Sequence, residues 1–108
     1  MLEDFRARLR PQLKLALLGD CACRKTLADL ADEARSSGLT GAEIDAALAG
    51  RSFEARAAAV LSFACAIKFA QPSTLERARH RALRYGLSHE ELAAVTEEAK
   101  HILASLTP

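Results

Sequence analysis

A pair of cysteines lies at the start of a predicted helix, in the segment Gly19-Asp20-Cys21-Ala22-Cys23-Arg24-Lys25. Asp20 is a good helix N-cap, which places Cys21 and Cys23 in the first turn of the helix that follows. There the unpaired backbone amides and the positive end of the helix dipole stabilise a thiolate, and Arg24 and Lys25 add positive charge. Peroxide reduction and disulfide exchange require such a thiol, because the thiolate is the attacking form.

The spacing of the two cysteines leaves three interpretations open. Residues two apart on a helix point to nearly opposite sides, so a disulfide between Cys21 and Cys23 needs a non-helical turn and is strained. Strained disulfides are oxidising and labile, which suits catalysis and not structure. The second interpretation is that a cysteine packs in the core as a small hydrophobic residue. The third is metal binding, although two cysteines without a matching second pair make a poor zinc site.

The other reactive side chains are scattered along the chain. Cys65 lies in the most apolar predicted helix, which indicates a core residue. His80 and His89 fall on or beside polar helix faces, as solvated histidines do. Glu98 and His101 have the Glu-x-x-His spacing of di-iron bundles, but those sites need a second copy of the motif, which the sequence lacks. We therefore expect no metal and no cofactor.

The composition favours an all-α fold. Half of the 108 residues are hydrophobic, 27% are charged and the formal net charge is +1, which is typical of one globular domain. The apolar residues are mostly helix formers such as alanine and leucine, and there is no tryptophan. Because a near-neutral chain lacks the electrostatic attraction that dominates nucleic-acid binding, we expect no nucleic-acid partner.

The sequence shows neither a signal peptide nor a membrane span. The N-terminal segment is charged and has no apolar core, and the longest apolar stretch, residues 57–66, is too short to cross a bilayer. Three cysteines without an export signal indicate reduced thiols in the cytoplasm. Because a small chain has much surface and half of this one is apolar, we expect a homo-oligomer that covers an apolar face.

Capping motifs mark the predicted helix boundaries. Thr40 to Glu43, Ser73 to Glu76 and Ser88 to Glu91 each read as a capping box, in which the hydroxyl accepts the N3 amide and the glutamate reaches back to the N-cap amide. Ser52 reads as a plainer N-cap, and Pro11 predicts a break or kink. With the spacing of apolar residues, these marks predict helices at about 2–9, 11–18, 21–37, 41–49, 53–70, 74–85 and 89–105, the one at 53–70 being central.

The chain also repeats itself after 48 residues. This shift aligns Thr26-Leu27 with Thr74-Leu75, Ala34 with Ala82, Gly38-Leu39-Thr40 with Gly86-Leu87-Ser88, and Glu43-Ile44 with Glu91-Leu92. Each copy, about 26–48 and 74–96, is a helix, a glycine turn and a further helix. The same punctuation also arises by chance, but here the register continues through the preceding helix. We predict one compact all-α domain, 1–108, built on a duplicated helix-turn-helix.

Three segments resemble the alkylhydroperoxidase-D-like (AhpD-like) and carboxymuconolactone decarboxylase superfamily, and the likeness covers residues 13 to 106. The apolar helix at 13–18 leads directly into a cysteine-bearing helix start. Residues 34–44 are similar to the family's small-residue, Gly-Leu-Ser/Thr, Glu-Ile turn, and 51–69 with 83–88 are similar to its all-apolar helix and second glycine turn. The resemblance implies an internally duplicated helical bundle that assembles as a trimer or hexamer.

Family members with peroxidase activity carry Cys-x-x-Cys followed by a histidine, with a glutamate upstream. With Cys21 as the first cysteine, Arg24 and Ala28 occupy the places of the second cysteine and the histidine. With Cys23 as the first, Thr26 and Leu30 occupy them, so neither register restores the motif. The upstream glutamate is also missing, because Glu3 is remote. The family's set of two cysteines, histidine and glutamate is therefore incomplete in this chain, or its redox pair is rebuilt from Cys21 and Cys23.

The leading hypothesis is a thiol-dependent redox role, with Cys21 as nucleophile, Cys23 as resolving thiol and a thiol reductant protein as partner. Arg24 would stabilise the thiolate, and Asp20 would cap the helix. One alternative is a catalytically silent helical oligomer that binds a ligand or a protein. Another is a cofactor-free decarboxylase of a small organic acid, with Arg24, Arg51 or Arg56 holding the carboxylate.

Overall fold

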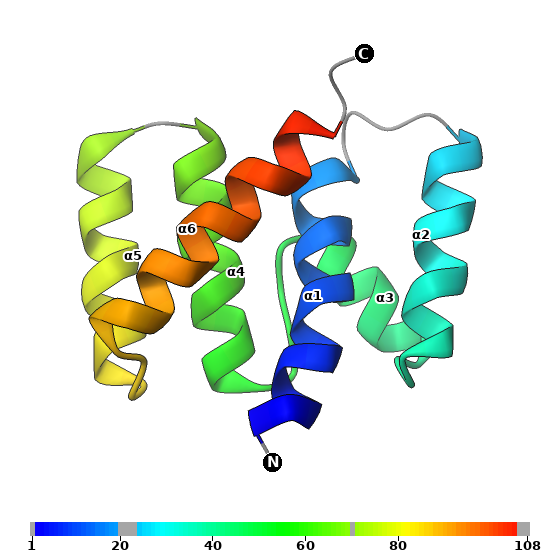
Figure 1. Ribbon diagram of the computed structural model, residues 1–108, viewed down its shortest axis with the longest axis horizontal. Coiled ribbons are helices and arrows are strands. Elements are labelled where there is room, and N and C mark those ends of the chain that lie inside the picture. The colour runs from blue at the N-terminus through cyan, green and yellow to red at the C-terminus, as the bar shows by residue number, and fades with distance from the viewer. Residues whose placement is uncertain (1, 20–23, 70, 106–108) are drawn as a thin grey trace.

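The structure is a computed structural model that describes residues 2–19, 24–69 and 71–105, and the side chains of residues 2–6 lie outside that description. Within this part of the chain there are helices and no strands, so the predicted all-α fold is confirmed. None of the described helices is long and apolar enough to cross a membrane. The helices are α1 (Leu2–Leu18), α2 (Arg24–Ser36), α3 (Gly41–Leu48), α4 (Ala55–Phe69), α5 (Pro72–Arg84) and α6 (His89–Ala104) (Figure 1).

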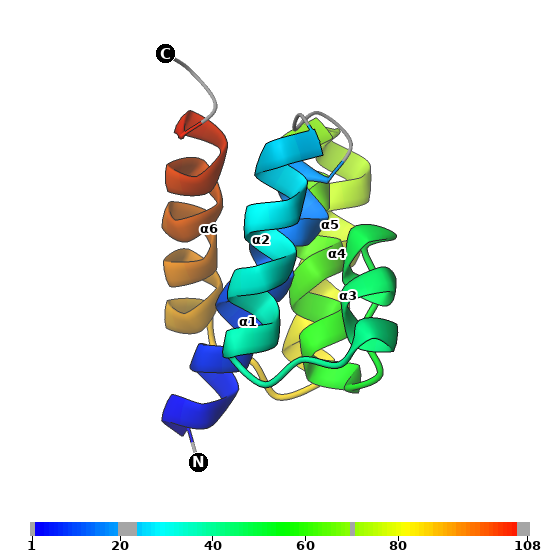
Figure 2. The same ribbon diagram turned by 90° about the vertical axis from the view of Figure 1, so that its right-hand side faces the viewer.

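Helices α1 and α4 form the centre of the molecule. α1 packs against α2, α3, α4 and α6, while α4 also packs against α5 and α6 (Figures 1 and 2). The prediction that the apolar helix around 53–70 is central is therefore confirmed. Many of its contact residues are alanines, whose small side chains let neighbouring helices approach closely. The buried residues of α4 are Ala57, Ala59, Val60, Leu61, Phe63, Ala64 and Ala66.

The two halves of the chain share one helix order and one turn geometry. α2 and α5 are both 13 residues long and lie 48 residues apart, and α3 and α6 also begin 48 residues apart. Gly38 and Gly86 end α2 and α5 with φ angles of 95° and 92°, a left-handed conformation that glycine adopts without steric cost. Leu39 and Leu87 follow them and are both buried. The helix-turn-helix unit is thus built twice.

Two of the three predicted capping boxes form. The Thr40 hydroxyl accepts the Glu43 amide at 3.2 Å, and the Glu43 carboxylate accepts the Thr40 amide at 2.9 Å. Ser88 and Glu91 make the same two hydrogen bonds, both at 3.0 Å. Each pair satisfies two backbone amides that have no partner within the helix and would otherwise bind water.

The third box, at Ser73–Glu76, is a wrong prediction. α5 begins earlier, with Pro72 in its first turn and Gln71 as an N-cap that makes no side-chain hydrogen bond. Proline suits this place, because its φ is already helical and its missing N–H has no helical partner there. The start of α4 also differs from the predicted one. The helix begins at Ala55 and not at 53, and the Ser52 hydroxyl accepts the Glu54 amide at 3.3 Å before the helix starts.

The predicted break at Pro11 is wrong as well. α1 runs through Pro11 as one helix, although proline removes a hydrogen bond from a helix interior. On either side of it, Leu9 and Leu13 are buried in the core. Burial of such side chains contributes about 1.5–3 kcal/mol each, which offsets the loss.

The difference between the real and the wrongly predicted caps gives a stability test. Ser88→Ala removes a hydroxyl that caps α6 and should lower the free energy of unfolding by about 1 kcal/mol. Ser73→Ala, a matched substitution on the exposed first turn of α5, should change it by less than about 0.5 kcal/mol. Urea denaturation followed by circular dichroism measures both, and equal losses would contradict the assigned start of α5.

Candidate functional site

The connection from α1 to α2 leaves from a tightly fixed point. The Gly19 amide donates to the Leu15 carbonyl at 2.9 Å. A β-carbon on Gly19 would lie 2.6 Å from that carbonyl oxygen and 2.8 Å from the Leu48 Cδ2 atom at the end of α3. Only glycine fits here, because a β-carbon would overlap both atoms. The absence of a side chain at Gly19 therefore lets the Leu48 side chain, at the end of α3, lie directly against the end of α1.

A lysine from the central helix holds the same end of α1. Lys68, in the last turn of α4, donates from Nζ to the Leu17 carbonyl at 2.8 Å. The last carbonyls of a helix carry partial negative charge and have no helical partner. The ammonium group therefore offsets the negative end of α1, at the point where the chain leaves for the cysteine segment.

The predicted site residues fall at this connection. Asp20, Cys21 and Cys23 lie within 20–23, outside the described residues, so the structure does not place them. Helix α2 is described from Arg24 onward, and its first turn contains no acidic residue. Arg24 and Lys25 are both exposed there. The positive end of α2 and two cationic side chains therefore directly follow the cysteine pair along the chain.

Cys65 lines a pocket instead of lying in the core. Its side chain is half-buried, whereas the residues on either side of it are fully buried. Gly50, with a φ of 74°, lies against it, since a β-carbon there would be 3.7 Å from the Cys65 sulfur. The pocket has a volume of about 630 Å³ and lies between the end of α3 and the hairpin of α4 and α5. Its lining is Ala49, Gly50, Ser62, Cys65, Ala66, Phe69, Gln71 and Thr74.

The pocket lies next to both contacts that hold the end of α1, the one between Gly19 and Leu48 and the one made by Lys68. Ala49 in its wall directly follows Leu48, which lies against Gly19, and Phe69 directly follows Lys68. The sequence favours a core position for Cys65, and the structure corrects this, since Cys65 is half-buried in the wall of the pocket. The sequence held no signal for it, because the pocket depends on how α3 ends against α4 and α5.

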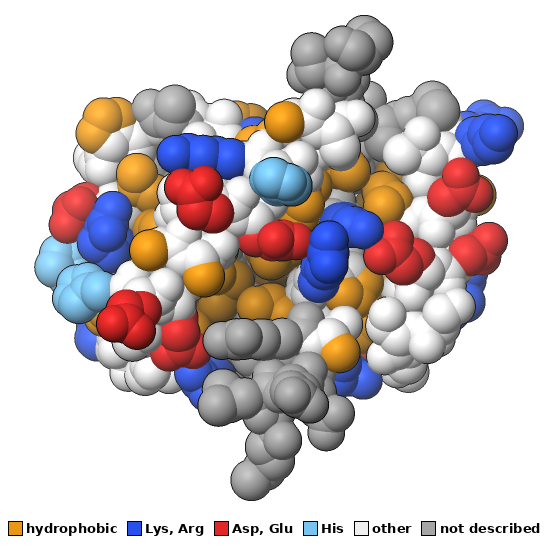
Figure 3. Space-filling model, viewed as in Figure 1, with side chains coloured by type: hydrophobic (Ala, Val, Ile, Leu, Met, Phe, Trp, Pro, Cys, Tyr) orange, Lys and Arg blue, Asp and Glu red, His pale blue; other side chains and the backbone are white. Residues whose placement is uncertain are grey.

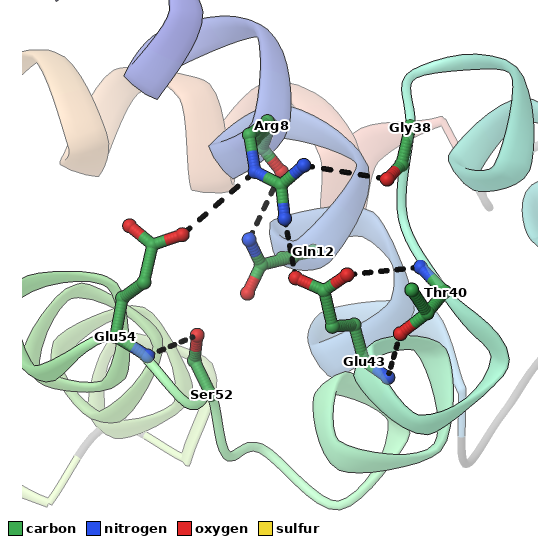
Figure 4. Close-up of polar contacts among 7 residues, drawn as sticks. All are labelled: Arg8, Gln12, Gly38, Thr40, Glu43, Ser52 and Glu54. Carbon is green, nitrogen blue, oxygen red and sulfur yellow. Dashed lines mark hydrogen bonds and ion pairs between the residues drawn. The ribbon is translucent and has the colours of Figure 1, made fainter.

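A polar cluster at the other end of α1 is centred on Arg8 (Figure 4). Its guanidinium pairs with Glu43 of α3, lies 3.7 Å from the Glu54 carboxylate and donates to the Gly38 carbonyl at 3.3 Å. The Thr40 amide is the main cause of a lowered pKa at Glu43. The Thr40 hydroxyl and Arg8 lower it further, while partial burial opposes them.

The same pairing recurs in the second half, which indicates a structural role. Arg56 lies 48 residues after Arg8 and pairs with Glu91 at 3.6 Å, just as Arg8 pairs with Glu43. Sequence analysis missed this, although the pattern Phe-x-Ala-Arg occurs at 5–8 and again at 53–56. Because Arg56 lies in the first turn of α4 at one end of the bundle and α2 begins at the other (Figure 1), Arg24 and Arg56 of the decarboxylase hypothesis do not lie together.

The candidate metal ligands are also dispersed. Glu98 pairs with Arg10 at 3.0 Å, and His101 is exposed. His80 lies 3.6 Å from Glu76 within its own helix. Among the residues that the structure describes, no three His, Cys, Asp or Glu side chains are placed to hold a metal ion.

No protein-family model matches the chain, and no curated protein or solved structure matches it either. The resemblance to the AhpD-like superfamily therefore stays a prediction.

The tight approach at Gly19 predicts a strong effect of a single methyl group. Gly19→Ala should lower the free energy of unfolding by about 1–3 kcal/mol, because one of its contacts is backbone and cannot move aside. Gly41→Ala is the matched control, since no atom lies within 4 Å of a β-carbon there, and it should be neutral or stabilising. Denaturant unfolding distinguishes the two, and similar losses would contradict the described packing.

The lowered pKa of Glu43 predicts a loss of stability in acid. The charged carboxylate is favoured by folding, so its contribution is present above its ordinary pKa of 4.5 and is lost as the pH falls through the lower folded value. Glu43→Gln should thus be less stable than the wild type at pH 7, and the difference should shrink below pH 4.5. Thermal unfolding against pH measures this, with Glu97→Gln on the exposed side of α6 as control. A constant difference would contradict the assignment.

Proposed function

We propose that this chain is a thiol-dependent redox protein, with Cys21 as the nucleophile and Cys23 as the resolving thiol. The observation that carries the proposal is the start of α2. It begins at Arg24, directly after the cysteine pair, with no acidic residue in its first turn and with Arg24 and Lys25 exposed. Helix N-termini and neighbouring cations favour thiolates.

Lys68 supports the proposal from the other side of the segment. The carbonyl end of α1 carries partial negative charge, which would disfavour a thiolate in the residues that follow. The ammonium group of Lys68 binds the Leu17 carbonyl at that end. Along the chain, the cysteine pair thus lies between a helix end that Lys68 neutralises and a helix start that carries Arg24 and Lys25.

The chemistry would consume one peroxide for each disulfide formed. The Cys21 thiolate attacks a peroxide oxygen, the O–O bond breaks, and the leaving oxygen takes a proton to become water or an alcohol. The Cys23 thiolate then attacks the sulfenic sulfur, and the S–O bond breaks with release of water. Two electrons pass from the thiols to the peroxide, and an external dithiol protein returns them by disulfide exchange. Asp20 would take up the thiol proton.

The pocket beside Cys65 favours a second candidate, a ligand-binding module without turnover. Its walls are mainly apolar, with Ser62, Gln71 and Thr74 as polar groups, which is the usual composition of a small-molecule site. This candidate needs no reactive cysteine. The reactivity of the thiols therefore separates the two functions.

Mass spectrometry with thiol trapping tests the redox proposal. After one equivalent of hydrogen peroxide, the protein should lose two hydrogen atoms, mapped to a Cys21–Cys23 bridge and restored by a dithiol. Cys21→Ala and Cys23→Ala should each abolish the bridge, while Cys65→Ala should keep it. If all three thiols stayed reduced, or were trapped only after unfolding, the ligand-binding module would be the better assignment.

The role of Arg24 is tested by the rate of alkylation near pH 6. Arg24→Gln should slow the reaction of Cys21 with iodoacetamide by roughly 2–5-fold, because it removes a charge that favours the thiolate. Arg51→Gln is the control, since Arg51 is an exposed arginine in the loop before α4. Equal rates for both variants and the wild type would remove Arg24 from the site.

A further inference from the structure

Helices α2 and α5 occupy equivalent places in the two halves and lie at opposite ends of the molecule's longest dimension (Figure 1). Each faces the core with a narrow apolar stripe, of which Leu30 and Ala34 are buried in α2 and Ala78 and Ala82 in α5. Figure 2 shows α2 at the edge of the bundle, in front of α1. The outer side of each helix is therefore turned away from the rest of the chain.

At several equivalent positions the outer sides of these two helices differ in charge. Under the 48-residue shift, Asp29 corresponds to Arg77 and Glu33 to Arg81. Asp32 corresponds to His80, and Ser36 corresponds to a further arginine, Arg84. All eight side chains are exposed. α2 also carries exposed Arg24, Lys25 and Arg35, and α5 carries exposed Glu76. In Figure 3, acidic side chains lie over α2 together with basic ones at its tip, and the opposite end of the face shown carries histidine, basic and acidic side chains.

The arginines of α5 are less engaged within the chain than the acids of α2. Glu33 pairs with Lys14 of α1 at 2.9 Å, which places Glu33 on the flank of α2 next to α1, and Asp32 pairs with Arg35 at 3.3 Å in its own helix. The Asp32–Arg35 pair is exposed on both sides and contributes little. In the part of the chain that the structure describes, no ion pair forms at Arg77, Arg81 or Arg84. The arginine side of α5 is thus available to an acidic surface.

We propose that α5 of one copy docks on α2 of a second copy through these two sides. The charged positions have matching spacing, since Asp29 and Glu33 are one helical turn apart and so are Arg77 and Arg81. Tyr85, 43% exposed at the end of α5 beside Arg81, adds apolar area to the same contact. The contact joins two different surfaces, so it is head-to-tail, and repeated copies close into a ring or extend into a chain.

The interface needs no cysteine, so its test is independent of the test of the redox proposal. Its alternative occupant is a nucleic acid held by the arginines of α5. The acidic side of α2 decides between them, because a second copy accounts for both charged helices, whereas a polyanion accounts for α5 alone and is repelled by α2.

Charge reversal in each partner tests the docking by sedimentation velocity at low salt. Arg77→Glu/Arg81→Glu and Asp29→Arg/Glu33→Arg should each weaken self-association by roughly a hundredfold, because like charges then face each other. An equimolar mixture of the two variants should associate again, as should the chain with all four substitutions. Arg51→Glu/Lys100→Glu is the control for charge alone and should assemble like the wild type. Circular dichroism checks that every variant is folded.

The wild-type assembly should also dissociate as salt is raised, because the pairing is electrostatic. A monomeric wild type at low salt would overturn the proposal, and binding of single-stranded RNA by that monomer would assign α5 to a nucleic acid. Variants that stay assembled, or a mixture of folded variants that stays dissociated, would overturn it too.

Discussion

Each half of this fold depends on a glutamate that serves two partners at once. Glu43 and Glu91 close the start of a helix by accepting the N-cap amide, and each also binds an arginine from the first helix of its half. Apolar packing between alanine-rich helices is non-directional and leaves their relative register open. A charge-assisted pair has a defined geometry. The arginine therefore fixes where the first helix crosses the third, and Arg8 extends this to the turn after α2 through the Gly38 carbonyl.

Holding α1 at this end determines where its other end lies. α1 is one continuous helix, so fixing Arg8 in its first half also positions Leu17 and Gly19 at its other end. There Lys68 binds the Leu17 carbonyl, and Leu48 packs against Gly19. The end of α1 that precedes the cysteine segment is therefore held by two contacts, and α2 follows that segment along the chain. The redox role proposed above would benefit, because such contacts would keep the neighbouring charges in place.

The parts of the structure that the sequence predicts are those governed by neighbours along the chain. Thr40 and Ser88 were identified as caps because a capping box is a local motif, and the glycine turns follow from the left-handed conformation that Gly38 and Gly86 supply. The start of α5 was missed because Pro72 at the first helical position outweighs a serine one residue later. Pro11 was misread since burial of the residues around it is a tertiary effect.

The candidate site shows the same division more sharply. The cysteine pair and its cationic neighbours are visible in the sequence, whereas Lys68 lies 51 residues from its carbonyl partner and Cys65 meets Gly50 only in the folded chain. The pairing of Arg8 and Arg56 with the capping glutamates could have been predicted. The Phe-x-Ala-Arg pattern repeats in register with the glycine turns, so the duplication includes the first helix of each half.

The two copies have kept their interior and changed their exterior. Ala34 and Ala82 are both fully buried at equivalent positions, because a larger side chain at either would force its helix away from the centre. No such constraint acts on the outer sides of α2 and α5, where the charge has changed sign. A head-to-tail contact between identical chains joins two different surfaces. In the interface proposed above, opposite charge makes the two surfaces different, and a contact of the same helix from two copies would place like charges together at these positions.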